Sequence, residues 1–283
     1  MNKFYPYIII FIHIILNSCS VFDKEEKIPS YIQIKQANLQ TNYSTEGANT
    51  HKINDVWINI DGNLQGIYEI PVTFPVLETG KRIITIRAGI KVNGIAASRA
   101  PYPFYEFLNI DTILPEKEIV VINPTFKYKE NIKFAWIEDF QGNGYSLERM
   151  IGSDTLLIVQ ADSNNSKYGV FCIDAVKQKF YYKSSEAYQL PKNGSAVFLE
   201  LDYRCNHPFT IGLLVNKLQS SVAHDIIIIN PHPNTFNHIY IDLTYTVTSN
   251  MDAVDFNIIF RGVLQDGYTD GKIEIDNIKL IHF

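Results

Sequence analysis

Apolar and polar residues alternate over many short stretches of this chain. The alternation is clear at residues 31–34 (YIQI), 56–60 (VWINI) and 83–87 (IITIR). A period of two is typical of half-buried β-strands, whereas apolar residues at helical spacing are scarce. Aromatic residues make up 13% of the chain and Ile and Val are abundant, which favours strands. We therefore expect an all-β protein.

Turn residues divide these strands into two groups. Asp61-Gly62 separates residues 56–60 from residues 65–68 and predicts a tight hairpin. A short polar join at residues 130–133 separates two sets of strands, and about 265 residues follow position 18. That length exceeds the usual single domain. We expect a small β-sandwich over 31–130 and a second domain over 134–283.

The second region shows regularly spaced strand patterns separated by Asn, Gly and Pro clusters. The expected strands cover residues 155–160, 168–173, 196–203, 209–215, 224–229, 237–245 and 255–260, between an opening segment from Phe134 and a closing segment from Gly271. Eight or nine strands at this spacing suit a jelly roll.

The start of the chain has the pattern of a secretory signal. Lys3 precedes the apolar run Ile8–Leu16, which is too short to span a bilayer. The residues that follow, Leu16-Asn17-Ser18-Cys19, resemble the lipobox of bacterial lipoproteins. This resemblance implies a signal peptide over 1–18, lipid on Cys19 and a tether over 19–30. The alternative is a cleaved soluble signal in which Cys19 has no role.

The flanking residues and the charge bear on location and partners. Ser20 stands where inner-membrane retention signals commonly have Asp, and Asp23, Glu25 and Glu26 resemble the acidic tracts of some surface lipoproteins. We expect a protein that the lipid on Cys19 anchors to the outer membrane. Whether it faces the periplasm or the cell exterior stays open. The net charge is −5 and the basic residues are scattered, so nucleic acid is excluded as a partner.

The segment 55–90 resembles the PEGA-type repeat, a small immunoglobulin-like β-sandwich module of bacterial surfaces. The matching residues are Asp61, Gly62, Gly66, Pro71, Gly80 and the strand 83–87. The resemblance implies a stalk or adaptor without catalytic residues. A Pro-rich loop follows, and its Tyr102, Phe104 and Tyr105 form either an exposed contact patch or the closed end of the sandwich.

The second region resembles the jelly rolls of carbohydrate-binding modules and galactose-binding-like domains. The resemblance lies in an opening Glu138-Asp139-Phe140 and a closing Ile275–Leu280 (IDNIKL), about 135 residues apart. It implies that the first and last strands run side by side and that a structural calcium ion lies between Glu138, Asp139 and Asp276. The alternative is that these carboxylates accept hydrogen bonds from backbone amides in turns. No other cofactor is expected.

The candidate ligand-binding residues lie in this second region. Tyr181, Tyr182, Tyr188 and Tyr203 offer flat faces for stacking on sugars, or else pack across strands within the sheets. Glu200 and Asp202 lie two apart on one strand, so both carboxylates point to one face. Glycosidases with this geometry use a third carboxylate, and this chain has Arg204 there instead. We therefore expect ligand contact or a structural role and no enzyme activity.

Cys172 and Cys205 form a candidate disulfide after export, with buried free thiols as the alternative. Three functions stay open at this point. The first is a non-catalytic lipid-anchored envelope protein that binds a glycan. The second is a structural or adaptor lipoprotein that binds another envelope protein, and the third is a glycan-cleaving enzyme that uses Glu200 and Asp202.

Overall fold

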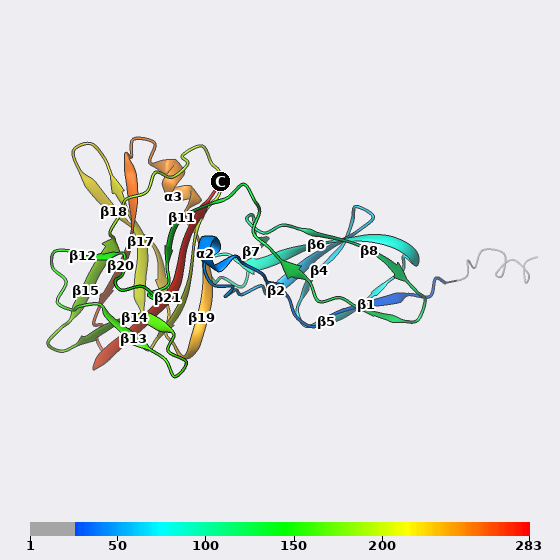
Figure 1. Ribbon diagram of the computed structural model, residues 1–283, viewed down its shortest axis with the longest axis horizontal. Helices are drawn as coiled ribbons and strands as arrows, with labels where there is room; N and C mark the ends of the chain where they lie inside the picture. The colour runs from blue at the N-terminus through cyan, green and yellow to red at the C-terminus, as the bar shows by residue number, and fades with distance from the viewer. Residues whose placement is uncertain (1–25) are drawn as a thin grey trace, which may run out of the picture.

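The computed structural model describes residues 26–283, which form two β-sandwiches placed end to end (Figure 1). The prediction of an all-β protein with two sandwiches is confirmed, and the second sandwich is a jelly roll. The signal peptide 1–18, Cys19 and the first part of the tether lie outside the described residues. In the part of the chain that is described, no helix has the length and apolar character needed to cross a membrane.

The first sandwich contains two main sheets. One has the order β4-β3-β6-β7, with β8 also on β6, and the other has the order β5-β1-β9. Its elements are β1 (Ser30–Ile34), β2 (Asn38–Leu39), α2 (Tyr43–Glu46), β3 (Asp55–Ile60), β4 (Asn63–Glu69), β5 (Val72–Val76), β6 (Gly80–Lys91), β7 (Arg99–Pro101), β8 (Leu108–Leu114), β9 (Ile119–Val121) and β10 (Thr125–Phe126). Asp61 and Gly62 both have positive φ, 49° and 83°, as the tight hairpin predicted between β3 and β4 requires.

The second sandwich packs a six-stranded sheet and a five-stranded sheet over one core. The order of one is β13-β14-β21-β16-β19, with β11 also on β21, and the order of the other is β12-β15-β20-β17-β18. Its elements are β11 (Lys133–Glu138), β12 (Leu147–Arg149), β13 (Ile158–Ala161), β14 (Lys167–Asp174), β15 (Lys179–Ser184), β16 (Val197–Cys205), β17 (Phe209–Asn216), β18 (Ser221–Ile229), β19 (His232–Asp242), α3 (Thr244–Ser249), β20 (Asp255–Val263) and β21 (Asp270–His282). The first and last strands, β11 and β21, pair antiparallel as expected.

Three details differ from the strands expected from the sequence. Residues 155–157 precede β13 instead of belonging to it, and Tyr245 lies in the helix α3 instead of extending β19. The strands β12 and β15 were not expected. Residues Lys179–Ser184 alternate inward and outward, which agrees with the cross-strand packing given as the alternative for Tyr181 and Tyr182.

The two sandwiches share a buried interface. Tyr102, Phe104 and Tyr105 of the first sandwich are at most 3% exposed and belong to one apolar cluster with Phe198 and Tyr240 of the second. The ring centroids of Tyr102 and Tyr240 lie 4.7 Å apart. The Pro-rich loop is therefore neither an exposed patch nor only the end of its own sandwich, because it packs against the neighbouring domain.

Candidate functional site

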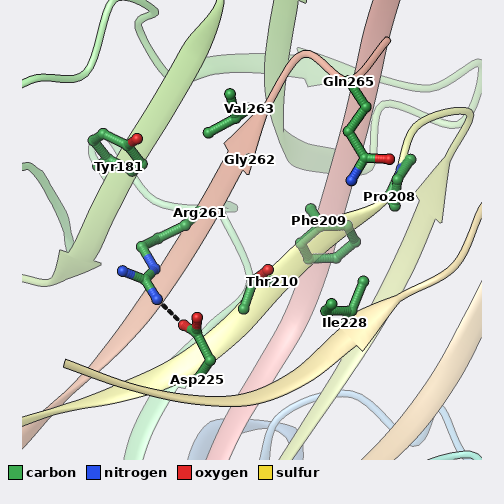
Figure 2. Close-up of a pocket in the computed structure, with 10 residues that line it drawn as sticks. All are labelled: Tyr181, Pro208, Phe209, Thr210, Asp225, Ile228, Arg261, Gly262, Val263 and Gln265. Carbon is green, nitrogen blue, oxygen red and sulfur yellow. Dashed lines mark ion pairs between the residues drawn. The ribbon is translucent and has the colours of Figure 1, made fainter. Parts of the chain in front are cut away.

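The outer face of the sheet β12-β15-β20-β17-β18 in the second sandwich carries a groove of about 350 Å³. The strand registers place Tyr181 (β15) opposite Arg261 (β20), Arg261 opposite Thr210 (β17), and Thr210 opposite Ile228 (β18). Directly opposed residues of neighbouring strands lie on the same face of a sheet. The four side chains therefore form a transverse row, and Figure 2 shows them around the groove. We call this row and the adjacent Asp225 the sheet groove.

An ion pair crosses the floor of the sheet groove. The guanidinium group of Arg261 contacts the carboxylate of Asp225 on β18, as the dashed line in Figure 2 shows. Gly212 lies between the two strands, opposite Asp225 and opposite Ile259. Gly212 has no side chain, and a Cβ there would come within 3.3 Å of the Asp225 Cα, so β17 and β18 approach closely beside the ion pair. Both charged side chains remain accessible, with 29% and 57% of their surfaces exposed.

A turn fixes the position of Tyr181 at one wall of the sheet groove. Its backbone N–H donates to Ser153 Oγ at 3.1 Å, and its carbonyl accepts from the N–H of Met150 at 2.9 Å. Gly152 lies against the ring, since a Cβ there would be 3.7 Å from two ring carbons. The aromatic face is thus held by its neighbours before any ligand arrives.

Polar side chains continue along the same outer face beyond the sheet groove. Asn216 Nδ2 donates to Asp255 Oδ1 and Asn257 Oδ1, both at 2.8 Å, and Ser221 Oγ donates to Asn216 Oδ1 at 2.7 Å. Asn216 pairs with Asp255 on one side and with Ser221 on the other. Along these strands the face therefore combines the Tyr181 ring, the Arg261–Asp225 ion pair and a set of amides and hydroxyls.

The other three candidate tyrosines lie in the interior of the second sandwich. Tyr182, Tyr188 and Tyr203 are at most 9% exposed. Tyr182 Oη accepts a hydrogen bond from Leu157 N at 2.9 Å, and the ring of Tyr188 stacks on Trp136 with centroids 6.1 Å apart. Burial raises the pKa of all three phenols. The structure brings Tyr181 alone of the four into the groove.

Glu200 lies on the opposite sheet, where the first sandwich covers it. Its carboxylate is fully buried and accepts hydrogen bonds from Tyr102 Oη at 2.5 Å and Tyr128 Oη at 2.7 Å. The buried Lys279 donates from Nζ to Tyr128 Oη at 3.3 Å and to the Ala48 carbonyl at 2.5 Å. Burial lowers the pKa of Lys279, while the charge of Glu200 opposes that effect. We call Tyr102, Tyr128, Glu200 and Lys279 the interdomain network.

Asp202 lies beside this network and is 6% exposed. His238 Nδ1 is 2.7 Å from Asp202 Oδ1, and Asn277 Nδ2 donates to Oδ2 at 2.9 Å. Burial acts to raise the pKa of Asp202, but the contacts with His238 and Asn277 outweigh it and hold the pKa below its ordinary value. Glu200 and Asp202 do share one face, as expected, yet that face is a domain interface and not a cleft where a substrate would meet them.

The three candidate calcium ligands are engaged in local hydrogen bonds. Glu138 accepts from the backbone N–H groups of Phe140 and Ser146, Asp139 from that of Gln141 and Asp276 from that of Asn277. Within residues 26–283 no group of three or more His, Cys, Asp or Glu side chains is arranged to hold a metal ion. The expectation of a calcium site stays a prediction, and in this structure the three carboxylates accept hydrogen bonds from backbone amides, as the alternative proposed.

The candidate disulfide is not formed. Cys172 and Cys205 are both free, Cys172 exposed and Cys205 buried. They lie on β14 and β16, on either side of β21, where they pair with the adjacent residues Lys272 and Ile273. Adjacent residues of a strand point to opposite faces, so the two thiols do too.

Sequence comparisons give no relatives for this chain. No family model matches it, and no curated protein matches it.

Several solved structures are similar to part of the chain. The CBM22-1–GH10 modules of a Clostridium thermocellum endo-1,4-β-D-xylanase, complexed with xylohexaose, match at 12% identity and a TM-score of 0.40, over 53% of this chain and 28% of that one. The match thus spans little more than a quarter of the xylanase chain. A family 29 carbohydrate-binding module complexed with mannohexaose matches at 14% identity and a TM-score of 0.34, over 52% and 88%. A family 22 xylan-binding domain matches at 15% identity and a TM-score of 0.35, over 52% and 93%.

Arg261, Asp225 and Thr210 are absent from the candidates that the sequence supplied. They come from three strands, and only the registers of those strands bring them together. No local motif marks them. The one available signal is the alternation within each strand, which identifies outward positions but does not say which strands are neighbours.

Proposed function

We propose that this protein is a non-catalytic, lipid-anchored envelope protein that binds a glycan in the sheet groove. The observation that carries the proposal is the transverse row itself, in which an accessible tyrosine ring, an exposed ion pair and a threonine hydroxyl meet in one groove. Sugars present apolar C–H faces and a rim of hydroxyls. The groove offers a partner for each.

The chemistry of the row suits a neutral or weakly charged sugar. The ring of Tyr181 supplies an apolar face with a polar tip, which suits a wet, amphipathic ligand. Arg261 donates several N–H groups in a fixed plane, and Asp225 accepts from hydroxyls. Arg261 and Asp225 neutralise each other, so this pair gives the groove no net charge that a ligand would have to balance.

The remaining parts of the proposal concern placement. The lipobox resemblance at Leu16–Cys19 supports a lipid on Cys19 and an outer-membrane location. More than one acyl chain is needed for stable anchoring, and lipoproteins meet that condition. The sandwich over 31–130, whose sequence resembles PEGA-type modules, spaces the domain over 134–283 from the membrane. Cys19→Ala should release the protein from membrane pellets, and an undiminished pellet fraction would contradict the anchor.

A glycan array on the mature chain, followed by titration calorimetry, tests the binding proposal. We expect binding to at least one oligosaccharide and at least a tenfold loss of affinity in Tyr181→Ala and in Arg261→Ala. Tyr245→Ala is the matched control, because Tyr245 is 82% exposed on the helix α3. An array without signal, or equal affinities in all variants, would overturn the proposal.

One observation favours the adaptor function as a second candidate. The strand registers place several exposed apolar side chains on one face of the sheet that holds β4, β6 and β8 of the first sandwich. Ile67, Ile83, Phe107 and Ile113 are between 46% and 66% exposed. Such a patch is typical of protein contact. Chemical crosslinking in cells should then capture an envelope partner that the double variant Ile83→Asp, Ile113→Asp loses, while Tyr181→Ala retains it.

A further inference from the structure

A second pocket, of about 160 Å³, lies between the two sandwiches on the side away from the sheet groove. The first sandwich contributes Lys52, Asn54, Lys91 and Gly94, and the strands β16 and β19 contribute Tyr203, Asn237, His238, Ile239 and Tyr240. None of these nine lining residues carries a carboxylate. We call it the interface pocket.

Two ammonium groups give the interface pocket a positive character in a chain whose net charge is −5. Burial lowers the pKa of Lys52, and the charge of Lys91 lowers it further. The Lys91 ammonium is 4.0 Å from Glu69, and that carboxylate is engaged more closely by Arg99 at 3.0 Å. Lys52 Nζ donates to the neutral side-chain oxygen of Asn237. Among the described residues Lys52 has no carboxylate partner, whereas Lys91 shares the carboxylate of Glu69 with Arg99.

Two further groups of the interface pocket have unused hydrogen-bonding capacity. Asn237 Nδ2 donates to Tyr203 Oη at 2.7 Å, so the hydroxyl proton of Tyr203 is left without an acceptor among the described residues. His238 Nε2 is buried without a hydrogen-bond partner, 3.7 Å from the nearest Glu200 oxygen. A ligand in the pocket can therefore accept the hydroxyl proton of Tyr203, whereas His238 Nε2 is closed to solvent and faces Glu200.

We infer that the interface pocket binds a small oxyanion of the phosphate or carboxylate class. Lys52 and Lys91 supply the charge and Tyr203 supplies a hydroxyl donor, a combination in which each oxygen of the anion receives a proton. At about 160 Å³ the interface pocket has less than half the volume of the sheet groove, which limits the occupant to a small ligand. A whole oligosaccharide does not fit.

The occupant would join the two sandwiches. Lys52 and Lys91 belong to the first, and Tyr203 and His238 belong to the second. An anion bound to both favours the docked arrangement, and any ligand that binds the folded state alone raises its stability. The inference does not depend on the sheet groove, which shares none of these residues.

Thermal unfolding of the mature protein at constant ionic strength tests the inference, with chloride, inorganic phosphate, glucuronate and glucose as probes. We expect a concentration-dependent rise in melting temperature with phosphate or glucuronate and none with glucose. Constant ionic strength removes general screening. A response to phosphate alone identifies a free phosphate site, and a response to glucuronate alone identifies an acidic sugar.

Two variants locate the response. Lys91→Gln should weaken the apparent affinity at least tenfold, and Tyr203→Phe should weaken it several-fold. Lys192→Gln is the control, because Lys192 makes its hydrogen bonds to backbone carbonyls elsewhere. Arg261→Ala should leave the response unchanged, which separates this site from the sheet groove. Absence of any response to both anions, or a response that Lys91→Gln does not reduce, overturns the inference.

Discussion

The Tyr102 hydroxyl donates a 2.5 Å hydrogen bond to the Glu200 carboxylate across the boundary between the two sandwiches. The Tyr128 hydroxyl, also from the first sandwich, donates to the second oxygen of the same carboxylate. A buried carboxylate is costly unless donors replace its water shell. Here one domain supplies both replacement donors to the other, so separating the domains would expose hydroxyls and carboxylate together.

Removing one of these donors should lower the free energy of unfolding. Tyr102→Phe leaves a fully buried Glu200 with one donor fewer, and loss of a partner to a buried charged group costs ~1–3 kcal/mol. Urea denaturation of the mature chain measures the change. Tyr145→Phe is the control, since Tyr145 is 40% exposed and its hydroxyl makes no hydrogen bond within the described residues. Equal stability of the two variants would contradict the role of this hydrogen bond.

Gly212 should not tolerate a side chain. A Cβ at this position would lie 2.3 Å from the carbonyl oxygen of His224, and that atom belongs to the backbone of β18. Gly212→Ala must therefore displace β18, with an expected loss of ~1–3 kcal/mol of stability and faster amide exchange along that strand. Gly144→Ala has open space around the added methyl and should be close to neutral. Normal protection of β18 amides in Gly212→Ala would show that the strand accommodates it.

Stability should fall as pH rises from about 4 to 8 because of Asp276. Burial, reinforced by Asp202, Asp139 and Glu138, raises the pKa of Asp276 to about 8, against ~3.9 in the unfolded chain. Between these values the folded state keeps a proton that the unfolded state has released, so each rise in pH favours unfolding.

The variant Asp276→Asn isolates this effect. It removes the titrating group, so the difference in unfolding free energy between pH 5 and pH 8 should shrink by ~1 kcal/mol or more. Urea denaturation at both values gives that difference. Asp266→Asn, an exposed loop position, serves as the matched change. An unaltered pH profile in Asp276→Asn would mean that Asp276 is ionised in the folded protein.

The two cysteines on β14 and β16 should differ in reactivity. Cys172 is exposed, whereas burial encloses Cys205 and raises the pKa of its thiol, so little of it is thiolate at neutral pH. A short treatment with an alkylating reagent, followed by peptide mass mapping, should find label on Cys172 and none on Cys205. Denaturant should make both react. Equal labelling of the native protein would show that β16 opens readily.

Most strands could be predicted because one face of each is buried. Residues 31–34 and 56–60 alternate in sequence and in burial alike. The error at Tyr245 has a local cause. The segment Thr244–Ser249 is rich in β-branched residues, but Asp242 accepts a hydrogen bond from Thr244 N at 2.8 Å and the chain turns into a helix. A side chain that binds nearby backbone groups overrides weak strand propensity here.

The site was harder to predict than the fold because it depends on strand neighbours. The sequence singled out Tyr181 for its aromatic ring, but Arg261 and Asp225 join it only through the order β15-β20-β17-β18. It also placed Glu200 and Asp202 on one face correctly. The first domain covers this face through Tyr128 and Tyr102, which lie about 70 and 100 positions before Glu200 in the chain. No local sequence pattern reveals contacts over such distances.

The placement of β1 determines how the molecule would bear load. β1 is near the start of the described chain and lies along the long axis, at the end far from the second sandwich (Figure 1). It is held between β5, antiparallel, and β9, parallel. Tension applied at residue 26 and resisted by the second sandwich pulls along β1, so its hydrogen bonds on both sides are sheared together instead of being peeled apart one by one. Such a strand yields only when the whole set fails, which makes it a mechanical clamp at the point where the tether enters the fold.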